Sequence, residues 1–540
     1  MSAQPTNNHK WLTLVAMTGA LSMILIDEVV VSVALPSIQR DLDMSQTALN
    51  WVVNAYLLTL AAFIALAGHL SDRLGRVRVC SAGIVLFALA SAGAGLATEP
   101  AHILVARAIQ GIGGAMLIPS SQAIVTSAFP VEERGRAMGI YAGISLGFLA
   151  IGPLIGGLLT ETAGWEWVFF VNVPVGAATL GLIAYAHPPG RPQGGGGFDA
   201  VGTALVVPGL TAMVYGLMQS GTWGWDDPRT IGLVAAGVAL LLAFVLVELR
   251  RRYPLVQLRL LRSGNFAGDS FVLFVVQFQI LGVSVFGAVY AQDVLGFSPI
   301  EAGLAITPVT IPLLVLAPIS GRVYDRIGAR LPVAAGCALT AVGLFAGALV
   351  LVELDYWYLV PAYFVLGVGL AFIMTPATTD GMNASPPELR GEASGLLQTL
   401  RQVGGSFGIA VMTGIVVSLN HSNLDENLRS EGISGAKAEK LEGFLAEAQQ
   451  GGSTQRFSSV PARERDEVTA AAKDAYASSL RVGWLVLAGV MALAAAIAAA
   501  VLRRIDYAAQ TRAPPHPLAA HAAARGTGAP TRGPALESSP

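Results

Sequence analysis

Charged residues are scarce in this chain. Asp, Glu, Lys and Arg together make up 13% of its 540 residues, whereas hydrophobic residues make up 54%. About a quarter of the residues in a soluble globular domain are charged, so this composition excludes an ordinary soluble domain. The formal net charge of −2 gives no support to nucleic-acid binding, which needs a concentrated positive surface.

Cysteine is also rare, and the chain lacks the common motifs of catalysis. Cys80 and Cys337 are the two cysteines, and two thiols on a reducing side of a membrane favour neither a disulfide nor a metal site. No Gly-x4-Gly-Lys-Ser/Thr motif, His/Glu metal spacing or nucleophile elbow occurs in the sequence. We therefore expect no enzyme activity, no ATP-driven pumping, no metal and no cofactor.

Long apolar runs are what the chain has in abundance. A membrane-spanning helix needs about 20 mostly apolar residues to cross ~30 Å of hydrocarbon. Fourteen such runs follow one another, which predicts an all-α integral membrane protein. They lie at about 11–36, 48–70, 79–97, 102–127, 137–160, 167–187, 199–219, 230–249, 266–290, 302–320, 332–352, 357–379, 394–419 and 481–502.

Arginine is distributed unevenly between the connections of these runs. If there are fourteen spans, the Arg clusters fall on the same side as Lys10, while the short opposite connections are acidic. The clusters are Arg73, Arg76 and Arg78; Arg134 and Arg136; Arg250 to Arg252, Arg259 and Arg262; Arg322, Arg326 and Arg330; and Arg503 and Arg504. By the positive-inside rule we expect a multi-pass protein of the cytoplasmic (inner) membrane with both termini cytoplasmic.

Two short charged turns show that the chain is duplicated. Gly68-His69-Leu70-Ser71-Asp72-Arg73-Leu74-Gly75-Arg76 is matched 253 positions later by Gly321-Arg322-Val323-Tyr324-Asp325-Arg326-Ile327-Gly328-Ala329. In each copy the glycines allow helix ends to approach and turn. The first copy follows the second span and the other follows the tenth. Two extra spans must therefore lie between two six-helix halves.

The spacing of the two turns predicts a domain organisation. We expect a cytoplasmic N-terminus at 1–10, a six-helix bundle at 11–187 and a linker with the two extra helices at 188–263. A second six-helix bundle at 264–504 would include an extracytoplasmic loop at 420–479, and 505–540 would be a disordered cytoplasmic tail.

The turn motif also resembles a known family signature. Gly-x-Leu-x-Asp-Arg-x-Gly-Arg is similar to the loop between helices 2 and 3 of the major facilitator superfamily. The two extra spans resemble those of its fourteen-helix drug:proton antiporter branch, typified by EmrB and QacA. This resemblance implies two six-helix bundles with the substrate crossing between them.

Acidic residues within the first span are the strongest functional signal, because burying a charge in a bilayer is costly. At ~1.5 Å per residue from Trp11, Asp27 lies ~24 Å into the membrane. Arg107 in the fourth span reaches a comparable depth, so the two are expected to pair. Such a carboxylate can exchange a proton, because burial and a neighbouring cation act on its proton affinity in opposite directions. A permanent structural clamp between Asp27 and Arg107 is the alternative.

The residue next to Asp27 is a second acid. Adjacent helical residues point ~100° apart, so Asp27 and Glu28 are not expected to face one cavity equally. Ile26 to Pro36 resembles the branch's Leu-Asp-x-Thr-x-Val-Asn-Val-Ala-Leu-Pro motif. Whether Glu28 is a second proton site or a contact for a cation stays open.

Further motifs of the resemblance lie in the fourth and fifth spans. Leu104 to Ala115, which includes Arg107, is similar to a motif implicated in proton coupling. Gly147 to Gly157 is similar to the antiporter motif of the fifth span, and here Pro153 bends the helix while glycines allow close packing against the other half. The glycines and proline that we expect to matter for gating are Gly152, Pro153, Gly156 and Gly157.

A set of aromatic and polar residues could line a substrate cavity. An aromatic face with a few polar groups suits lipophilic or cationic compounds, although aromatic stripes more often pack in the core or face lipid. The candidates are Trp51, Tyr56, Phe274, Gln277, Phe278, Arg401 and Gln402. Asp269 and Asp380 lie near the expected cytoplasmic ends, where water is close, and we assign them no transport role.

These observations predict a monomeric transporter driven by the proton gradient. It would exchange external protons for lipophilic or cationic drug-like compounds by alternating access of its two halves. Export or import of one specific small metabolite is the alternative. No accessory partner is evident in the sequence.

Overall fold

The computed structural model describes residues 7–188, 199–251, 254, 256–385, 390–430 and 462–503, and helices make up most of these residues. The N-terminal half contains α1 (Asn7–Asp41), α2 (Gln46–Leu74), α3 (Arg76–Gly95), α4 (Pro100–Ala128), α5 (Val131–Thr162), α6 (Glu166–Phe170) and α7 (Asn172–Ala186). Two helices follow, α8 (Ala200–Trp223) and α9 (Pro228–Arg250). The C-terminal half contains η1 (Leu258–Arg262), α10 (Gly264–Val289), η2 (Tyr290–Val294), α11 (Pro299–Ala305), α12 (Thr307–Ile327), α13 (Arg330–Val350), η3 (Leu351–Glu353), α14 (Tyr356–Asn383), α15 (Arg390–Ser430) and α18 (Ala462–Val501).

The helix count confirms the expected all-α membrane fold. Thirteen helical segments of the described residues are long and apolar enough to cross a membrane. The helix α5, whose side chains are only partly described, adds a further helix of 32 residues. Together they correspond to the fourteen predicted spans. The main difference is local, because the predicted span at 167–187 is divided into α6 and α7 at Val171.

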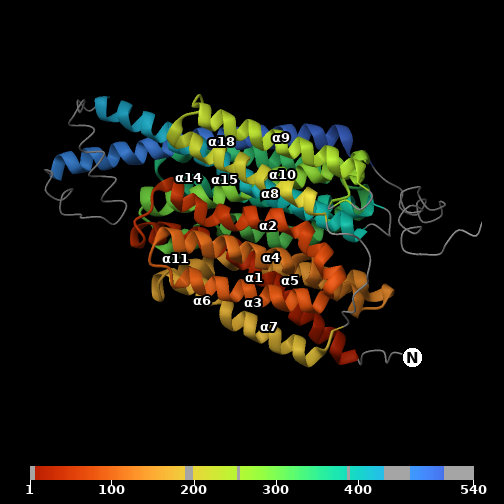
Figure 1. Cartoon of the computed structure of the whole chain (residues 1–540). Helices are drawn as coiled ribbons and strands as arrows, with labels where there is room; N and C mark the ends of the chain where they lie inside the picture. The colour runs from red at the N-terminus through yellow and green to blue at the C-terminus, as the bar shows by residue number, and fades with distance from the viewer. Residues whose placement is uncertain are drawn as a thin grey trace, which may run out of the picture.

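The long helices run side by side, as Figure 1 shows. The start of α1 and the end of α18 lie at the same end of the bundle. We call this the inner end and the opposite end the outer end. Within the N-terminal half α1 packs against α5 and α7, and in the C-terminal half α10 packs against α14, α15 and α18. The halves meet where α1 contacts α10, α2 contacts α15 and α5 contacts α11.

The two matched turns have the same backbone geometry. Gly75 ends α2 with φ of 103°, and Gly328 ends α12 with φ of 79°. Positive φ is readily adopted by glycine alone, which explains why both copies have glycine there. In each copy the glycine N–H bonds to the carbonyl four residues earlier, on Ser71 at 3.0 Å and on Tyr324 at 2.8 Å.

A second pair of glycines, Gly83 and Gly336, lies 253 positions apart like the two turns and has equivalent packing. A methyl group added to Gly83 in α3 would lie 3.1 Å from the carbonyl oxygen of Gly113 in α4. One added to Gly336 in α13 would lie 2.7 Å from the carbonyl oxygen of Gly369 in α14. Both glycines therefore allow a close backbone crossing. The duplication read from the sequence is present in the packing of both halves.

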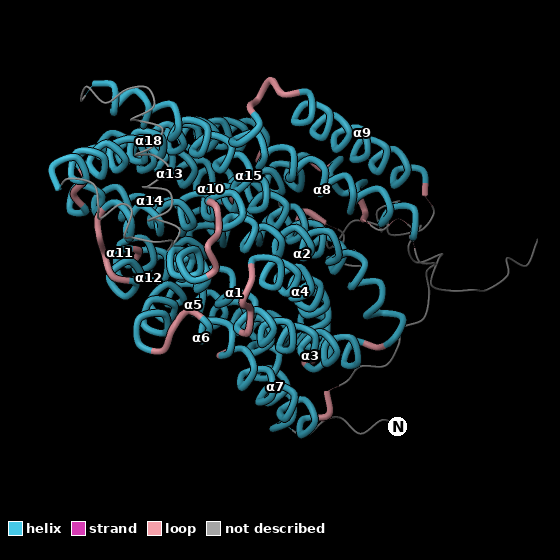
Figure 2. The backbone as a smooth tube through the Cα atoms, turned by 60° about the vertical axis from the view of Figure 1, so that its left-hand side comes forward, coloured by secondary structure: helices cyan, strands magenta, loops and turns pink. Residues whose placement is uncertain are grey.

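The extra helices α8 and α9 pack as a pair at the side of the molecule. α8 contacts α2 and α15, whereas α9 packs mainly against α8. Figures 1 and 2 both place α9 at the periphery. Its exposed apolar side chains, such as Leu242 and Leu246, are 59% and 55% exposed, as expected for a helix that faces lipid. This pair therefore lies beside the junction of the halves, where α8 contacts both of them.

The region predicted as a loop at 420–479 is partly helical. α15 continues eleven residues past the predicted end at 419 and its last residues include a charged stretch, while α18 begins at Ala462. Both helices project beyond the rest of the bundle at the outer end (Figure 1). The middle of the predicted loop, at 431–461, and the tail at 505–540 lie outside the described residues. The domain boundaries stay predictions.

Candidate functional site

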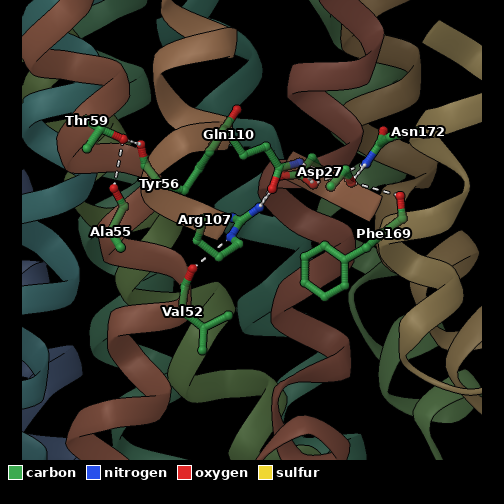
Figure 3. Close-up of polar contacts among 10 residues, drawn as sticks. Asp27, Val52, Ala55, Tyr56, Thr59, Arg107, Gln110, Phe169 and Asn172 are labelled. Atoms are coloured by element: carbon green, nitrogen blue, oxygen red, sulfur yellow. Dashed lines mark hydrogen bonds and ion pairs between the residues drawn. The ribbon is translucent and has the colours of Figure 1, made fainter. Parts of the chain in front are cut away.

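Asp27 of α1 is buried inside the N-terminal half, where it is paired with Arg107 of α4. The Nη1 atom of Arg107 donates to Oδ2 of Asp27 over 2.5 Å, and both side chains have no exposed surface. Gln110 donates to Oδ1 of Asp27 over 2.8 Å, and Asn172 of α7 donates to the same atom over 3.3 Å. Figure 3 shows these groups converging on the carboxylate. Donors of the protein thus replace water around Asp27.

Arg107 is held by several contacts besides Asp27. Its Nε donates to the carbonyl oxygen of Val52 in α2 over 2.8 Å, and Nη1 also donates to Oε1 of Gln110 over 2.8 Å. The guanidinium lies over the ring of Tyr56, 4.4 Å from its centroid, a cation–π contact. Tyr56 therefore supports the ion pair within the N-terminal half, and the structure does not place it with the other cavity candidates.

Glu28 points towards the C-terminal half. Its Oε1 accepts a hydrogen bond from Nε2 of Gln277 in α10, and Oε1 of Gln277 accepts from Nε of Arg401 in α15 over 2.8 Å. Among the described residues, Oε2 of Glu28, Nη2 of Arg401 and both amide atoms of Gln402 are buried without a hydrogen-bond partner. A polar cluster of four candidates, which we call the junction cluster (Glu28, Gln277, Arg401 and Gln402), thus links the two halves.

Aromatic side chains lie next to the junction cluster on α10 and α15. The rings of Phe274 and Phe278 stack with their centroids 6.4 Å apart, and Phe407 packs 6.0 Å from Phe274. Trp51 lies elsewhere, with its ring 5.8 Å from that of Tyr215 in α8. The structure therefore brings together the candidates of α10 and α15 but separates Trp51 from them.

Sequence reasoning missed two polar links between the halves. Nδ2 of Asn50 in α2 donates to Oγ1 of Thr413 in α15 over 2.9 Å. One helical turn further on, Nδ2 of Asn54 donates to the carbonyl oxygen of Ser406 over 3.2 Å. Both asparagines are fully buried. Their spacing of four residues within an apolar run was a signal, because it places two amides on one face of the helix.

The comparison with known families decides the classification. The family model described as Major Facilitator Superfamily matches residues 17–409. The chain belongs to the major facilitator superfamily. Among solved structures, this major facilitator is similar to a bacterial homolog of the human lysosomal transporter Spinster in an inward-facing conformation. The TM-score is 0.61 at 18% identity, covering 92% of this chain and 97% of that one.

Several curated proteins of the same superfamily are similar over most of their length. The tetracenomycin C resistance and export protein of Streptomyces glaucescens is 33% identical over 529 residues, 97% of both chains. The puromycin resistance protein pur8 of Streptomyces alboniger is 34% identical over 430 residues, 77% of this chain and 83% of that protein. The sequence resemblance to the drug:proton antiporter branch is thereby confirmed.

The antiporter-like motif of this major facilitator makes close backbone contacts on two sides of α5. A methyl group added to Gly157 would lie 2.4 Å from the carbonyl oxygen of Pro299 in α11, and one added to Gly303 would lie 2.3 Å from that of Pro153. These two glycines therefore let the halves touch, as expected for the motif.

The other two glycines of the motif face their own half. A methyl group added to Gly152 would lie 2.3 Å from Cγ2 of Val29, and one added to Gly156 would lie 2.7 Å from the carbonyl oxygen of Val30. The expectation that the motif packs only against the other half is thus incomplete. α5 also crosses α1 closely, directly after Asp27 and Glu28.

We expect Gly157→Ala to push α5 and α11 apart. Overpacking costs about 1–3 kcal/mol, and because the contact joins the two halves, we expect transport to slow several-fold. Thermal unfolding and transport in vesicles measure the two effects. Gly147→Ala in the same helix is the matched control, because nothing lies within 4 Å of the methyl group it adds. Equal effects of both substitutions would contradict this reading.

The turn residues lie at the inner end of the bundle. Gly68 packs against Pro119 of α4 and Gly321 against Thr375 of α14, each about at van der Waals contact (3.7 Å for an added methyl group). Arg76 donates to the carbonyl oxygen of Ala123 over 3.5 Å. The exposed members are Arg73, Asp325 and Arg326. The side chain of Asp72 lies outside the described residues, so its pairing stays a prediction.

Proposed function

We propose that this protein is a proton-driven exporter of drug-like compounds across the cytoplasmic membrane. The observation that carries the proposal is the arrangement of two adjacent acids on α1. Asp27 is paired with Arg107 inside one half, and Glu28 accepts from Gln277 of the other half, which in turn accepts from Arg401. The printed names of the relatives, which include resistance and export proteins, support the direction of transport.

The geometry suggests how protons and substrate are coupled. Protonation of Asp27 would remove the negative charge that holds Arg107, and Arg107 also anchors α2 through the carbonyl oxygen of Val52. A change in the charge of this pair would therefore act on α1, α2 and α4 together. Because Glu28 is the next residue on α1, the same change would reach the junction cluster. Binding of a proton at Asp27 and binding of substrate at the junction cluster could in this way oppose each other through α1.

The junction cluster is the proposed place of substrate contact. Unbonded polar atoms of Glu28, Arg401 and Gln402 are available there to a compound that enters between the halves. The rings of Phe274, Phe278 and Phe407 on α10 and α15 would contact its apolar part. A few polar groups among aromatic side chains suit lipophilic compounds that carry a polar or charged group.

We further propose that the inner end faces the cytoplasm, since the Arg clusters of the sequence fall at this end. The protein would then act as a monomer, without a cofactor, and would move its substrate without converting it. The proton gradient would be the energy source, as proposed for Asp27 above.

Cells that make the protein are expected to accumulate less of a fluorescent lipophilic dye than cells without it. An uncoupler should remove this difference, because it collapses the gradient that drives exchange. Dye fluorescence in the two strains, with and without uncoupler, is the measurement. Efflux that persists unchanged after uncoupling would overturn the proposed energy source.

Transport of one specific small metabolite is a second candidate. The polar links of the halves through Asn50 and Asn54, together with the junction cluster, favour a more hydrophilic compound than a typical dye. A panel of dyes, antibiotics and metabolites on inverted vesicles separates the two. Transport of a single metabolite, with no antibiotic or dye moved, would favour this candidate.

A further inference from the structure

Asp269 is a buried acid that the proposed transport mechanism does not use. It lies in α10, five residues after the helix begins at Gly264, and therefore near the inner end. Its side chain is fully buried, and among the described residues neither of its carboxylate oxygens has a hydrogen-bond partner. It lies near the inner end, as expected, but the neighbouring helices cover it completely. A bare ionised carboxylate in such a place would cost several kcal/mol.

The group that Asp269 faces is another acid, Asp380 of α14. Asn265 lies one turn before Asp269 on the same face of α10, and it donates to Oδ2 of Asp380 over 2.9 Å, so the two carboxyl groups lie side by side. Close packing of α10 on α14 brings them together, since a methyl group added to Gly381 would lie 3.4 Å from Cβ of Asp269. Two carboxylates at such a distance in a dry site cannot both be ionised without strong repulsion.

Asp380 is surrounded by donors, in contrast to Asp269. Nδ2 of Asn265 donates to its Oδ2 over 2.9 Å, and the hydroxyl of Tyr324 donates to its Oδ1 over 3.2 Å. Hydrogen bonds to the ionised form favour that form. These donors make Asp380 the acceptor of the pair, so a proton shared by the two acids would belong on Asp269.

The same donors connect the acid pair to other helices of the C-terminal half. Tyr324 belongs to the second matched turn, at the end of α12. Asn265 also bonds both backbone groups of Arg503, at 2.7 Å and 3.1 Å, directly after α18. The pair thus lies where α10, α12, α14 and the end of α18 meet, and a change in its charge would act on all four.

We propose that Asp269 and Asp380 form a second proton-binding site, separate from Asp27, whose shared proton keeps the inner end of the C-terminal half closed. Loss of the proton leaves two charges facing each other, and their repulsion separates α10 from α14 and admits water. The site lies ~8 Å from the start of α10, whereas Asp27 lies ~30 Å from the start of α1 at 1.5 Å per residue. The two sites therefore communicate with opposite sides of the membrane.

The groups that the neighbouring helices present around Asp269 favour a proton as the species that it binds. α14 contributes Asp380 and α12 contributes Tyr324. At this level α15 presents the apolar Leu397, which packs against Gly381. At the end of α18 the backbone of Arg503 takes part while its side chain is exposed. Asp380 is thus the titratable side chain that faces Asp269 from these helices.

Infrared spectroscopy of the full-length protein in lipid nanodiscs tests the protonation directly. At neutral pH we expect the parent to show a protonated-carboxyl band that Asp269→Asn lacks. Asp325→Asn is the matched control, because Asp325 lies in the same turn as Tyr324 but is exposed and should be ionised. Identical spectra of the parent and Asp269→Asn in this band would overturn the proposal. If Asp269→Asn does not fold, Asp380→Asn is used: the buried Asp269 then stays neutral, so the band should persist but shift in frequency because its acceptor is gone, and an unshifted band would overturn the proposal.

Labelling of a reporter thiol tests the closure. Leu397→Cys is introduced after Cys80 and Cys337 are replaced by Ser. Inverted vesicles are used, in which the inner end of the protein faces the medium. An impermeant maleimide is added to this medium in the absence of substrate. Labelling is divided by that of a fully exposed reporter thiol at the same pH, so that titration of the thiol itself cancels. We expect this ratio to rise several-fold from about pH 6 to about pH 9 and to be low and independent of pH after Asp269→Asn. Labelling of the parent that does not change with pH, or that follows sodium at fixed pH, would overturn the proposal. Because no substrate is needed, the result is independent of the export function.

Discussion

Asp27→Asn is expected to abolish transport driven by the proton gradient, so that the transport rate falls to that of vesicles without the protein. Asparagine cannot carry a proton, and it removes the negative charge that Arg107 contacts over 2.5 Å. Dye uptake into inverted vesicles after a proton gradient is imposed measures the effect. Full activity of Asp27→Asn would refute the proton-carrying role. Asp27→Glu, which keeps a titratable group, should retain part of the activity.

The same substitution is expected to destabilise the protein. Removing one partner of a buried ion pair costs about 3–5 kcal/mol, because the other charge stays buried without compensation. Gln110 and the carbonyl oxygen of Val52 still contact Arg107, so we expect the helices to insert. Thermal unfolding in detergent, together with the amount of protein in the membrane, separates lost stability from lost transport.

A second substitution decides between a proton carrier and a permanent clamp. In the Asp27→Asn/Arg107→Gln double variant no unpaired charge is left, so we expect stability to recover to near that of the parent. If Asp27 carries the proton, transport stays absent in this variant. If the ion pair only holds α1 and α4 together, transport returns along with stability. Unfolding temperature and uptake measured on the same preparation give both answers.

The duplicated parts of the fold were the most predictable from sequence. Gly75 and Gly328 could be matched because a positive φ requires glycine at a fixed place after each helix. Gly83 and Gly336 could be matched because each allows a backbone crossing. Where a span ends was less predictable, since α15 continues to Ser430 through polar residues that hydropathy assigns to a loop.

The candidate site was predictable in its charges but not in all of its neighbours. The helical angle between Asp27 and Glu28 correctly separated their surroundings, and depth alone paired Asp27 with Arg107. Gln110 and Asn172, which complete the shell of Asp27, were missed because an uncharged polar side chain in a span has no unique partner in sequence. Tertiary packing decides which amide reaches which carboxylate.

Asp269 shows why depth in the membrane is a poor guide to burial. Its position near the end of a span suggested contact with water. In the structure α14 covers Asp269, because Gly381 of α14 allows the two helices to pack closely. No local sequence pattern links a glycine on one helix to an acid on another, so this burial could not be predicted.

Glu28→Gln is expected to reduce transport of a dicationic dye at least tenfold, while a neutral compound is transported at close to the parent rate. In the parent the charge of Glu28 balances that of Arg401 across the junction cluster. Glutamine leaves the positive charge of Arg401 without the negative charge of Glu28. This positive charge then repels a dication. Unit charges 4 Å apart interact by about 4 kcal/mol at an effective dielectric constant near 20. Since ~1.4 kcal/mol corresponds to a factor of ten, about a third of this repulsion is enough.

The reciprocal substitution gives the opposite selectivity. Arg401→Gln leaves Glu28 as the unbalanced charge, so we expect the dication to be transported relatively better than the neutral compound. Initial rates of both compounds in the same inverted vesicles, compared with the exposed control Glu301→Gln, measure the ratio. A ratio that stays constant in both variants would mean that Glu28 and Arg401 join the halves without contacting substrate. Undiminished dication transport by Glu28→Gln would remove Glu28 from the mechanism, and opposite shifts would show that the junction cluster selects substrates by charge.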